Sequence, residues 1–459
     1  MPVTKFSVPE KYTYLSGFGG YHQSEAIPGA LPIGINSPQL PPFSLSTERI
    51  SGTSFTAPRS QNLQTWLYLV HPSLSHSDFS PLPSSYRSPS ILSSDEEFHL
   101  TPNALRWNDF PITPNQDWIS SQKIIAKSGS PAKKEGLAYM IYAASESMPP
   151  QTIFSSSDSD YLIIPQSGTL DIHTELGHLL VRQNEICVIP RGIRYRVSLP
   201  NGPARGYICE LYQGHFQLPE LGPIGSCSLA NVRDFQIPTA YFEGSISNGV
   251  ATCEREAWTV VTKLAGKLWQ CSQAHTPFDI AAWHGTYYPY KYDLGRFSAI
   301  GSISFDHPDP SISTVLTAPS HREPGTAVVD FAIFPPRWLV MEGTYRPPYF
   351  HRNSISEFAG VVINSQEEES VWNKGEGFGP FGATLNGAMV SHGMDRRTHE
   401  QARKQELRPE KVGMEGFTMF LLESERMMGV SGWALEAAGE GGSKGPISGA
   451  LKDQEKAKL

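Results

Sequence analysis

The sequence predicts a mainly β protein, because of its turn-forming composition and its series of short apolar runs. The 459 residues include 40 glycines and 38 prolines, which favour frequent turns over long helices. In the first half of the chain, runs rich in β-branched residues alternate with turn signals, at residues 161–165, 169–173, 178–181 and 186–190. Short, evenly spaced antiparallel strands of this kind are typical of a cupin-like jelly-roll.

A second series of apolar runs predicts a second β module. It consists of residues 297–300, 327–333 and 417–422. We therefore expect a larger N-terminal β domain over residues 1–278 and a smaller C-terminal catalytic β domain over residues 279–436.

Three other segments have a composition unlike that of strands. Residues 73–94 are rich in Ser and Pro and predict a surface insertion. Residues 402–411 alternate in charge and predict a helix that ends near Gly413. Residues 437–459 are rich in Gly, Lys and Glu and predict a flexible tail.

Composition also argues against several classes of protein. A net charge of −8 disfavours a nucleic-acid partner, which requires a basic surface. No apolar run approaches the roughly 18 residues of a membrane helix. The five cysteines are scattered and form no CxxC pair, so we expect free thiols in a reducing compartment.

The two ends of the chain bear on its location in the cell. The first residues lack the apolar core of a signal peptide, so a cytoplasmic protein is the default expectation. The chain ends in Ala457, Lys458 and Leu459, close to the Ser-Lys-Leu signal that directs proteins to peroxisomes. A peroxisomal address is therefore the alternative.

His351, Glu357 and His392 form the candidate metal site. Two imidazoles and one carboxylate are the ligand set of an open non-haem iron centre. Six residues of straight strand would separate His351 from Glu357 by about 20 Å, so the chain must reverse between them if both bind one metal. Residues 352–354 supply suitable turn chemistry. Spacing alone leaves open the alternative that each His is an ordinary satisfied polar group.

Two further side chains are candidates for a role near this site. Tyr349 lies two residues before His351 and would point to the same face of a strand. His284 lies among tyrosines and could shuttle a proton, because its reference pKa is near neutrality. The alternative for His284 is a buried histidine in an aromatic core.

Several motifs together resemble the homogentisate 1,2-dioxygenase family. The most specific are Phe-Pro-Pro-Arg-Trp at 334–338, Arg-Pro-Pro-Tyr-Phe-His-Arg-Asn at 346–353 and Ser-Glu-Phe at 356–358. Matching segments earlier in the chain are 14–19, 51–60, 105–107, 184–189, 191–192, 221–225, 230–231, 283–285 and 289–292. The resemblance covers roughly residues 12–436.

The resemblance implies an enzyme that uses Fe(II) and O₂ to cleave an aromatic ring. It implies Fe(II) held by His351, Glu357 and His392, with Tyr349 and His392 next to the substrate and His284 as the catalytic acid/base. The implied reaction converts homogentisate to maleylacetoacetate in tyrosine and phenylalanine breakdown. The implied assembly is a homo-oligomer, a trimer or a hexamer built as a dimer of trimers.

Several positions depart from the family pattern, among them Asn386 and Gln366. The family usually has His where this chain has Asn386, and Tyr where it has Gln366. An Asn side chain forms hydrogen bonds but cannot act as an acid or base near neutral pH. The sequence therefore leaves two enzymes open: a homogentisate dioxygenase with a weakened proton relay, or a paralogue that cleaves another substituted hydroquinone. A cupin that binds a small aromatic molecule without turnover is the third alternative.

Overall fold

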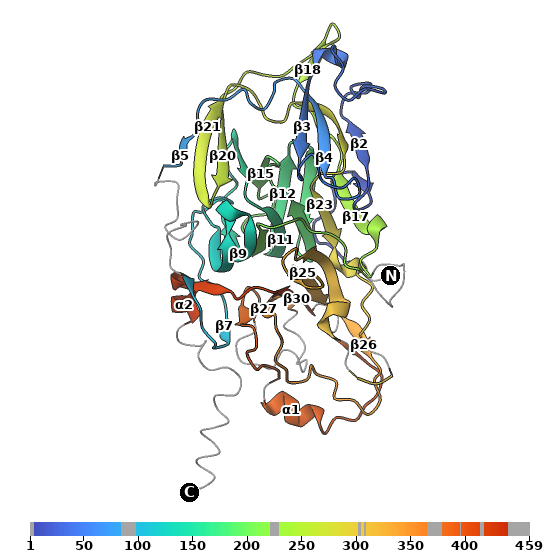
Figure 1. The fold of residues 1–459 in the computed structure, drawn as a ribbon, viewed down its shortest axis with the longest axis vertical. Helices are drawn as coiled ribbons and strands as arrows, with labels where there is room; N and C mark the ends of the chain where they lie inside the picture. Colours follow the sequence, from blue (N-terminus) through green and yellow to red (C-terminus); the bar gives the residue numbers. More distant parts are fainter. Residues whose placement is uncertain are drawn as a thin grey trace.

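The computed structural model describes residues 4–83, 98–220, 229–301, 304–306, 309–364, 379–394, 396–413 and 417–438. The protein is mainly β with a cupin-like arrangement of sheets, as the sequence predicts (Figure 1). Its two described α-helices are short: α1 (Arg396–Ala402) and α2 (Gly432–Ala438). Neither helix is long or apolar enough to span a bilayer.

A ten-stranded sheet forms the middle of the molecule (Figure 1). Its strands, in spatial order, are β1 (Tyr14–Ser16), β17 (Phe235–Pro238), β23 (Tyr290–Asp293), β14 (Glu185–Ile189), β11 (Asp160–Ser167), β16 (Ala204–Leu211), β9 (Glu135–Ala144), β8 (Lys123–Ser130), β31 (Gly429–Ser431) and β6 (Phe98–His99).

Two sheets lie in the upper part of the molecule as drawn in Figure 1. The seven-stranded sheet contains β13 (Gly177–Arg182), β12 (Thr169–Thr174), β15 (Tyr195–Ser198), β10 (Thr152–Ser156), β20 (Trp258–Leu264), β21 (Lys267–Gln273) and β5 (Ser80–Pro81). The four-stranded sheet contains β2 (His22–Glu25), β22 (Ile280–Gly285), β4 (Gln64–Leu69) and β3 (Ser46–Ser51).

The six-stranded sheet at the bottom of Figure 1 carries the candidate site. It contains β24 (Thr314–Pro319), β25 (Ala327–Phe334), β30 (Phe417–Ser424), β27 (Ser356–Asn364), β28 (Ala383–Asn386) and β7 (Leu105–Trp107). Two small ribbons complete the described strands: β18 (Ser245–Ser247) with β19 (Val250–Thr252), and β26 (Arg337–Leu339) with β29 (Glu410–Val412).

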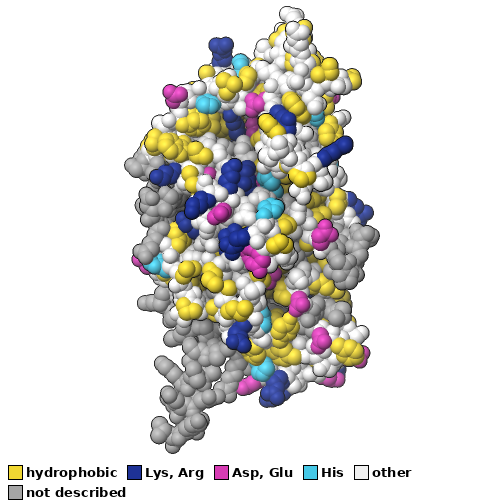
Figure 2. All heavy atoms as spheres, in the orientation of Figure 1, with side chains coloured by type: hydrophobic (Ala, Val, Ile, Leu, Met, Phe, Trp, Pro, Cys, Tyr) yellow, Lys and Arg dark blue, Asp and Glu magenta, His cyan; other side chains and the backbone are white. Residues whose placement is uncertain are grey.

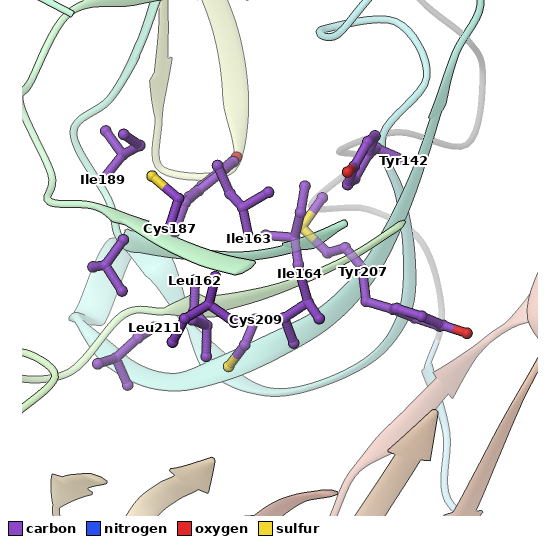
Figure 3. Packing of buried hydrophobic residues seen from close by; sticks show 14 of the residues in the cluster. Tyr142, Leu162, Ile163, Ile164, Cys187, Ile189, Tyr207, Cys209 and Leu211 are labelled. Atoms are coloured by element: carbon purple, nitrogen blue, oxygen red, sulfur yellow. The ribbon is translucent and has the colours of Figure 1, made fainter. Parts of the chain in front are cut away.

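The middle sheet is buried on both faces, which explains why its strands are almost continuously apolar. Figure 3 shows Ile163 and Cys187 on one side of the sheet and Leu162 and Cys209 on the other. On the Leu162 side, the ring of Tyr139 stacks on Phe358 of the six-stranded sheet, with centroids 4.9 Å apart. This packing fixes the sheet that carries the candidate site against the centre of the protein.

The two predicted modules exchange strands. The predicted boundary at residues 278 and 279 precedes β22 and β23, which pair with β4 and β14 of the N-terminal half. Conversely, β7 joins the C-terminal sheet, and β31 joins the middle sheet. Strand pairing alone therefore favours a division after β23.

Most of the predicted strands are present, and two local predictions were wrong. The runs at 161–190 form β11 to β14, and 327–333 and 417–422 lie in β25 and β30. Residues 297–300, however, form no strand, and 402–411 is not a helix. Helix α1 ends at Ala402, and Glu410–Val412 pairs with β26 instead. Pro409, which lacks the N–H that a helix requires, immediately precedes that strand.

Part of the predicted Ser/Pro insertion is tied to the sheets. The backbone N–H of Ser73 donates to Glu48 on β3 at 2.8 Å, and β5 pairs with β21. Residues 84–94 of the insertion and the predicted tail from residue 439 onward lie outside the described residues.

The mixture of charges on the surface and the free state of the described cysteines agree with what the composition predicts. Figure 2 shows Lys and Arg side chains interspersed with Asp and Glu on one face. Cys187, Cys209 and Cys271 are buried, Cys253 is half-buried, and all four are free thiols. Cys227 lies outside the described residues.

Candidate metal centre

His351 and His392 are held side by side by their backbones. Two hydrogen bonds of 3.1 Å join them in an antiparallel bridge, one from each N–H to the carbonyl oxygen of the other residue. His351 precedes β27 and His392 follows β28, so the bridge continues the pairing of these two neighbouring strands. The sheet thereby brings together two residues that are 41 positions apart in sequence.

Glu357 joins the two histidines because the chain bends between residues 351 and 357. The bend occurs at Ser354 and Ile355, and β27 begins immediately afterwards. One ligand atom from each of the three side chains lies within 4.8 Å of the other two. The sequence-predicted triad is therefore a compact cluster in the tertiary structure.

Backbone carbonyls determine which nitrogen of each imidazole faces the cluster. His351 Nδ1 lies 2.9 Å from the carbonyl oxygen of Tyr349, and His392 Nδ1 lies 2.9 Å from that of Val390. A carbonyl oxygen only accepts, so each Nδ1 carries the proton. In the neutral rings, both Nε2 atoms therefore present lone pairs towards Glu357, as metal-binding histidines do.

The distances between the donor atoms of the triad suit a single metal ion bound by all three side chains. Glu357 Oε1 lies 3.3 Å from His351 Nε2, and Glu357 Oε2 lies 2.8 Å from His392 Nε2. Although His392 Nε2 is buried and close to this carboxylate oxygen, it makes no hydrogen bond within the described part of the chain. A buried nitrogen lone pair beside a carboxylate is a suitable position for a cation. The donor set, two imidazoles and one carboxylate, fits Fe(II).

The electrostatics of the triad favour an ionised Glu357 beside the two imidazoles. Burial by itself raises the pKa of Glu357, but the neighbouring His392, Asn353 and His351 outweigh burial and hold that pKa below its usual value. Burial lowers the pKa of His392, but the contact with Glu357 and its charge, the carbonyl of Val390 and the charge of Glu423 together raise it above its usual value. Glu357 is therefore ionised at neutral pH and available as a ligand.

A row of polar side chains extends from Glu357 across the six-stranded sheet. Glu357 pairs with Glu423 of β30 on one side and with Asn386 of β28 on the other, and Glu423 pairs with Asp330 of β25. Directly paired residues point to the same face of a sheet. Asn386, a departure from the family pattern, thus lies beside the candidate ligand Glu357. Gln366, another departure, lies outside the described residues.

Tyr349 lies at the edge of the triad, as its spacing from His351 predicts. Its ring meets the His351 ring edge-on with centroids 5.7 Å apart. Its hydroxyl donates to Asp309 at 2.5 Å, and this hydrogen bond raises the pKa of Tyr349 above its usual value. The side chain is about half exposed, so it borders the approach to the triad.

His284 lies in a different sheet from the triad. It is on β22, between β2 and β4, which Figure 1 shows at the top of the molecule, whereas β27 is at the bottom. His284 Nε2 is 3.1 Å from the hydroxyl oxygen of Tyr68, and Nδ1 is buried without a hydrogen-bond partner in the described residues. Burial lowers the pKa of His284. Within one chain, no described contact joins His284 to His351, Glu357 or His392.

Three residues near the triad were not singled out from the sequence. Asn353 donates to Glu357, Glu423 pairs with it, and Asp309 accepts from Tyr349. Asn353 lies within the same turn as the ligands, so its position was a usable signal. Glu423 and Asp309 are far from the ligands in sequence, and only strand pairing and tertiary packing bring them close.

Comparisons with known proteins cover nearly the whole chain. A family model described as "Homogentisate 1,2-dioxygenase N-terminal" matches residues 13–294, and its C-terminal counterpart matches residues 295–441. A protein of Emericella nidulans named homogentisate 1,2-dioxygenase is 52% identical over 437 residues, which cover 95% of this chain and 94% of that protein. A Drosophila melanogaster protein of the same name is 45% identical and covers 93% of this chain and 94% of its own length.

Several solved structures also resemble parts of this chain. A cupin-2 domain containing protein from Shewanella frigidimarina is 21% identical, with a TM-score of 0.17, and the match covers 21% of this chain and 83% of that chain.

Proposed function

The chain belongs to the homogentisate 1,2-dioxygenase family, and we propose that it cleaves the ring of homogentisate with O₂ to form maleylacetoacetate. The reaction breaks the bond between a hydroxyl-bearing ring carbon and the adjacent carbon that carries the side chain. Both atoms of O₂ enter the product. The single observation that carries this proposal is the cluster of His351, Glu357 and His392 within a chain that matches the family models over residues 13–441.

The triad would hold the cofactor, Fe(II). Its donor atoms, its fixed imidazole orientations and the buried Nε2 of His392 fit that ion. When bound, Fe(II) supplies the redox chemistry and the Lewis acidity that the reaction requires. The protein side chains orient the substrate and transfer its proton.

Tyr349 and His392 border the space that the substrate would occupy. Tyr349 presents a half-exposed aromatic ring with its hydroxyl fixed by Asp309. His392 is part of the triad itself, so a substrate held at the metal would also touch its ring. This arrangement would orient an aromatic molecule and reduce the entropy lost on reaching the transition state.

His284 is our candidate for the acid/base that takes the phenolic proton and later returns it. Its lowered pKa keeps the imidazole neutral near pH 7, which is the form that accepts a proton. Nδ1 is the nitrogen without a described partner and is therefore the atom available for this transfer. His284 lies on β22, between β2 and β4 at the top of Figure 1, whereas the triad lies on the sheet at the bottom. An acid/base role therefore requires His284 of one copy to act at the triad of a second copy.

Complementation between two inactive variants tests this arrangement. We expect H284A and H351A each to be inactive as pure oligomers and to regain activity when the two chains are co-expressed in one oligomer. The regained activity would come from sites that combine His284 of one copy with the triad of another. Mixed oligomers without activity would rule out a site shared between copies, and normal activity of H284A alone would remove His284 from the mechanism.

Oxygen uptake tests the proposed reaction itself. The protein, purified without O₂ and loaded with Fe(II), should consume one O₂ per homogentisate and form maleylacetoacetate. Uptake with a related hydroquinone but not with homogentisate would favour the paralogue, and binding without any uptake would favour a non-catalytic cupin. Asn386 is the observation that keeps the paralogue as the second candidate.

Assembly and location complete the proposal. We propose a homo-oligomer, a trimer or a hexamer, because the role of His284 needs a second copy that supplies the triad. We also propose a cytoplasmic location. The alternative is a peroxisomal address carried by the C-terminal Ala457, Lys458 and Leu459, which lie outside the described residues. Deletion of these three residues should leave the location unchanged if the protein is cytoplasmic.

A further inference from the structure

Asn353 is fixed on both sides within the turn between the first two ligands. Its side-chain Oδ1 accepts from the backbone N–H of Ile355 at 3.1 Å. Its backbone carbonyl oxygen accepts a hydrogen bond from the backbone N–H of Met389 at 2.7 Å. This hydrogen bond ties the turn to the segment that leads to His392. These contacts leave the amide nitrogen of Asn353 with a single direction to point.

That amide nitrogen donates to Oε1 of Glu357. The orientation of the amide is determined because Ile355 N–H is a donor and must face the oxygen of Asn353, not its nitrogen. Oε1 therefore carries a hydrogen bond from Asn353 and also lies 3.3 Å from His351 Nε2. The second oxygen, Oε2, faces the buried Nε2 of His392, which has no described hydrogen-bond partner.

We propose that Asn353 is a positioning residue that makes Glu357 a monodentate ligand. By occupying Oε1 and fixing the plane of the carboxylate, Asn353 leaves Oε2 as the oxygen available to the metal. A carboxylate that binds through both oxygens would use one more coordination position. Asn353 would thus keep that position open for the aromatic substrate or O₂, the two molecules that an open site must accommodate. This inference rests on the proposed function.

The physical basis is the competition between a hydrogen bond and a metal for one carboxylate oxygen. An amide that donates to a charged oxygen forms one of the stronger hydrogen bonds in proteins. Neighbours of this kind orient ligands, and their loss commonly changes metal affinity or activity by about 10- to 100-fold. Glu357 is almost fully buried, so water is a poor substitute for the lost donor.

Infrared spectroscopy of the full-length protein loaded with Co(II) tests the proposal directly. The asymmetric and symmetric carboxylate stretches are further apart in a monodentate ligand than in a bidentate one. In the infrared difference spectrum of Co(II)-loaded minus metal-free protein, we expect a wide separation between the two stretches for the wild type. For N353A we expect a narrow separation. We also expect azide to bind the Co(II) of N353A at least about tenfold more weakly than that of the wild type. In N353A the second oxygen of Glu357 would occupy the coordination position that azide needs.

Two further variants separate positioning from folding. N353S keeps an oxygen that can accept from Ile355 N–H but is too short to reach Oε1, so it should give the narrow separation even if N353A does not fold. S354A changes an exposed neighbour in the same bend and should match the wild type.

The possible outcomes distinguish this inference from the proposed function. A wild-type protein that shows no Co(II)-dependent carboxylate bands, or bands that persist in H351A, would overturn the proposed metal site. Wild-type bands with a wide separation that is unchanged in N353S and N353A would overturn only the role of Asn353. A wide separation in the wild type that narrows in both Asn353 variants, but not in S354A, would support it.

Discussion

Glu357 of β27 and Glu423 of β30 stand directly opposite each other in the antiparallel register, so their carboxyl groups lie side by side on one face of the sheet. Both residues are buried, and Asp330 of β25 extends the row beyond Glu423. Adjacent acids in a buried site cannot all ionise without cost. Burial and the neighbouring Glu357, Asp330 and Asp309 raise the pKa of Glu423 to about 8.

The raised pKa of Glu423 predicts that the stability of the metal-free protein falls as pH rises. The unfolded chain releases this proton near pH 4.5, whereas the folded protein keeps it until about pH 8. Stability from Glu423 is therefore complete below the unfolded pKa and is lost between these two values, at about 1.4 kcal/mol per pKa unit. E423Q should show a smaller fall in the free energy of unfolding over this window, measured by urea titration. Equal falls in both proteins would contradict the prediction.

Removal of either histidine ligand should abolish metal binding. Because three donors would hold the ion, H351A and H392A should each lose Fe(II) affinity by at least about 100-fold. The thermal midpoint of the wild type should rise on addition of Fe(II), whereas that of the variants should not. H321A, which changes an exposed histidine on a loop, is the matched control and should respond as the wild type does. If H351A and H392A keep the rise in midpoint, the ligand assignment is wrong.

Lys263 should be essential for stability although it is remote from the triad. Its buried ammonium lies 2.8 Å from Asp158 and also contacts Glu210, and both acids are buried. K263M would leave two buried carboxylates without their cation, so we expect it to lower the free energy of unfolding by about 3–5 kcal/mol. Urea titration measures this loss. K267M, at an exposed lysine on β21, should change stability little, and a similar loss in both variants would refute the explanation.

Asn386 should limit the rate if the proton relay is weakened at that position. Asn386 pairs with Glu357, so a histidine at position 386 would put an imidazole on the sheet face that carries this candidate ligand. We expect N386H to raise kcat/KM for homogentisate by at least about tenfold and to add an ionisation near pH 6.5 to the pH–rate profile. T384H introduces a histidine two residues earlier on the same strand and serves as the control. An unchanged rate for N386H, with a normal fold, would favour the paralogue that cleaves another hydroquinone.

The class of fold could be predicted from the sequence because it depends on local patterns. Alternating apolar runs and turn residues specify strands such as β11 to β14, and their boundaries agree closely with the structure. The failures occurred where a distant partner decides the conformation. Residues 410–412 form a strand because β26 pairs with them, and no property of the charged segment itself indicates that partner.

The sequence by itself determined the candidate ligands, since the motifs around His351, Glu357 and His392 specify their residue types and the turn between the first two. Only the tertiary structure decided what surrounds them. The pairing of β27 with β30 and β28 sets Glu423 and Asn386 beside Glu357, and the turn sets the amide of Asn353 on one carboxylate oxygen. The tertiary structure also placed His284 in a different sheet, on β22 between β2 and β4. The reason is physical: ligand chemistry resides in individual side chains, whereas hydrogen-bond direction, shared burial and separation arise only when distant strands pair.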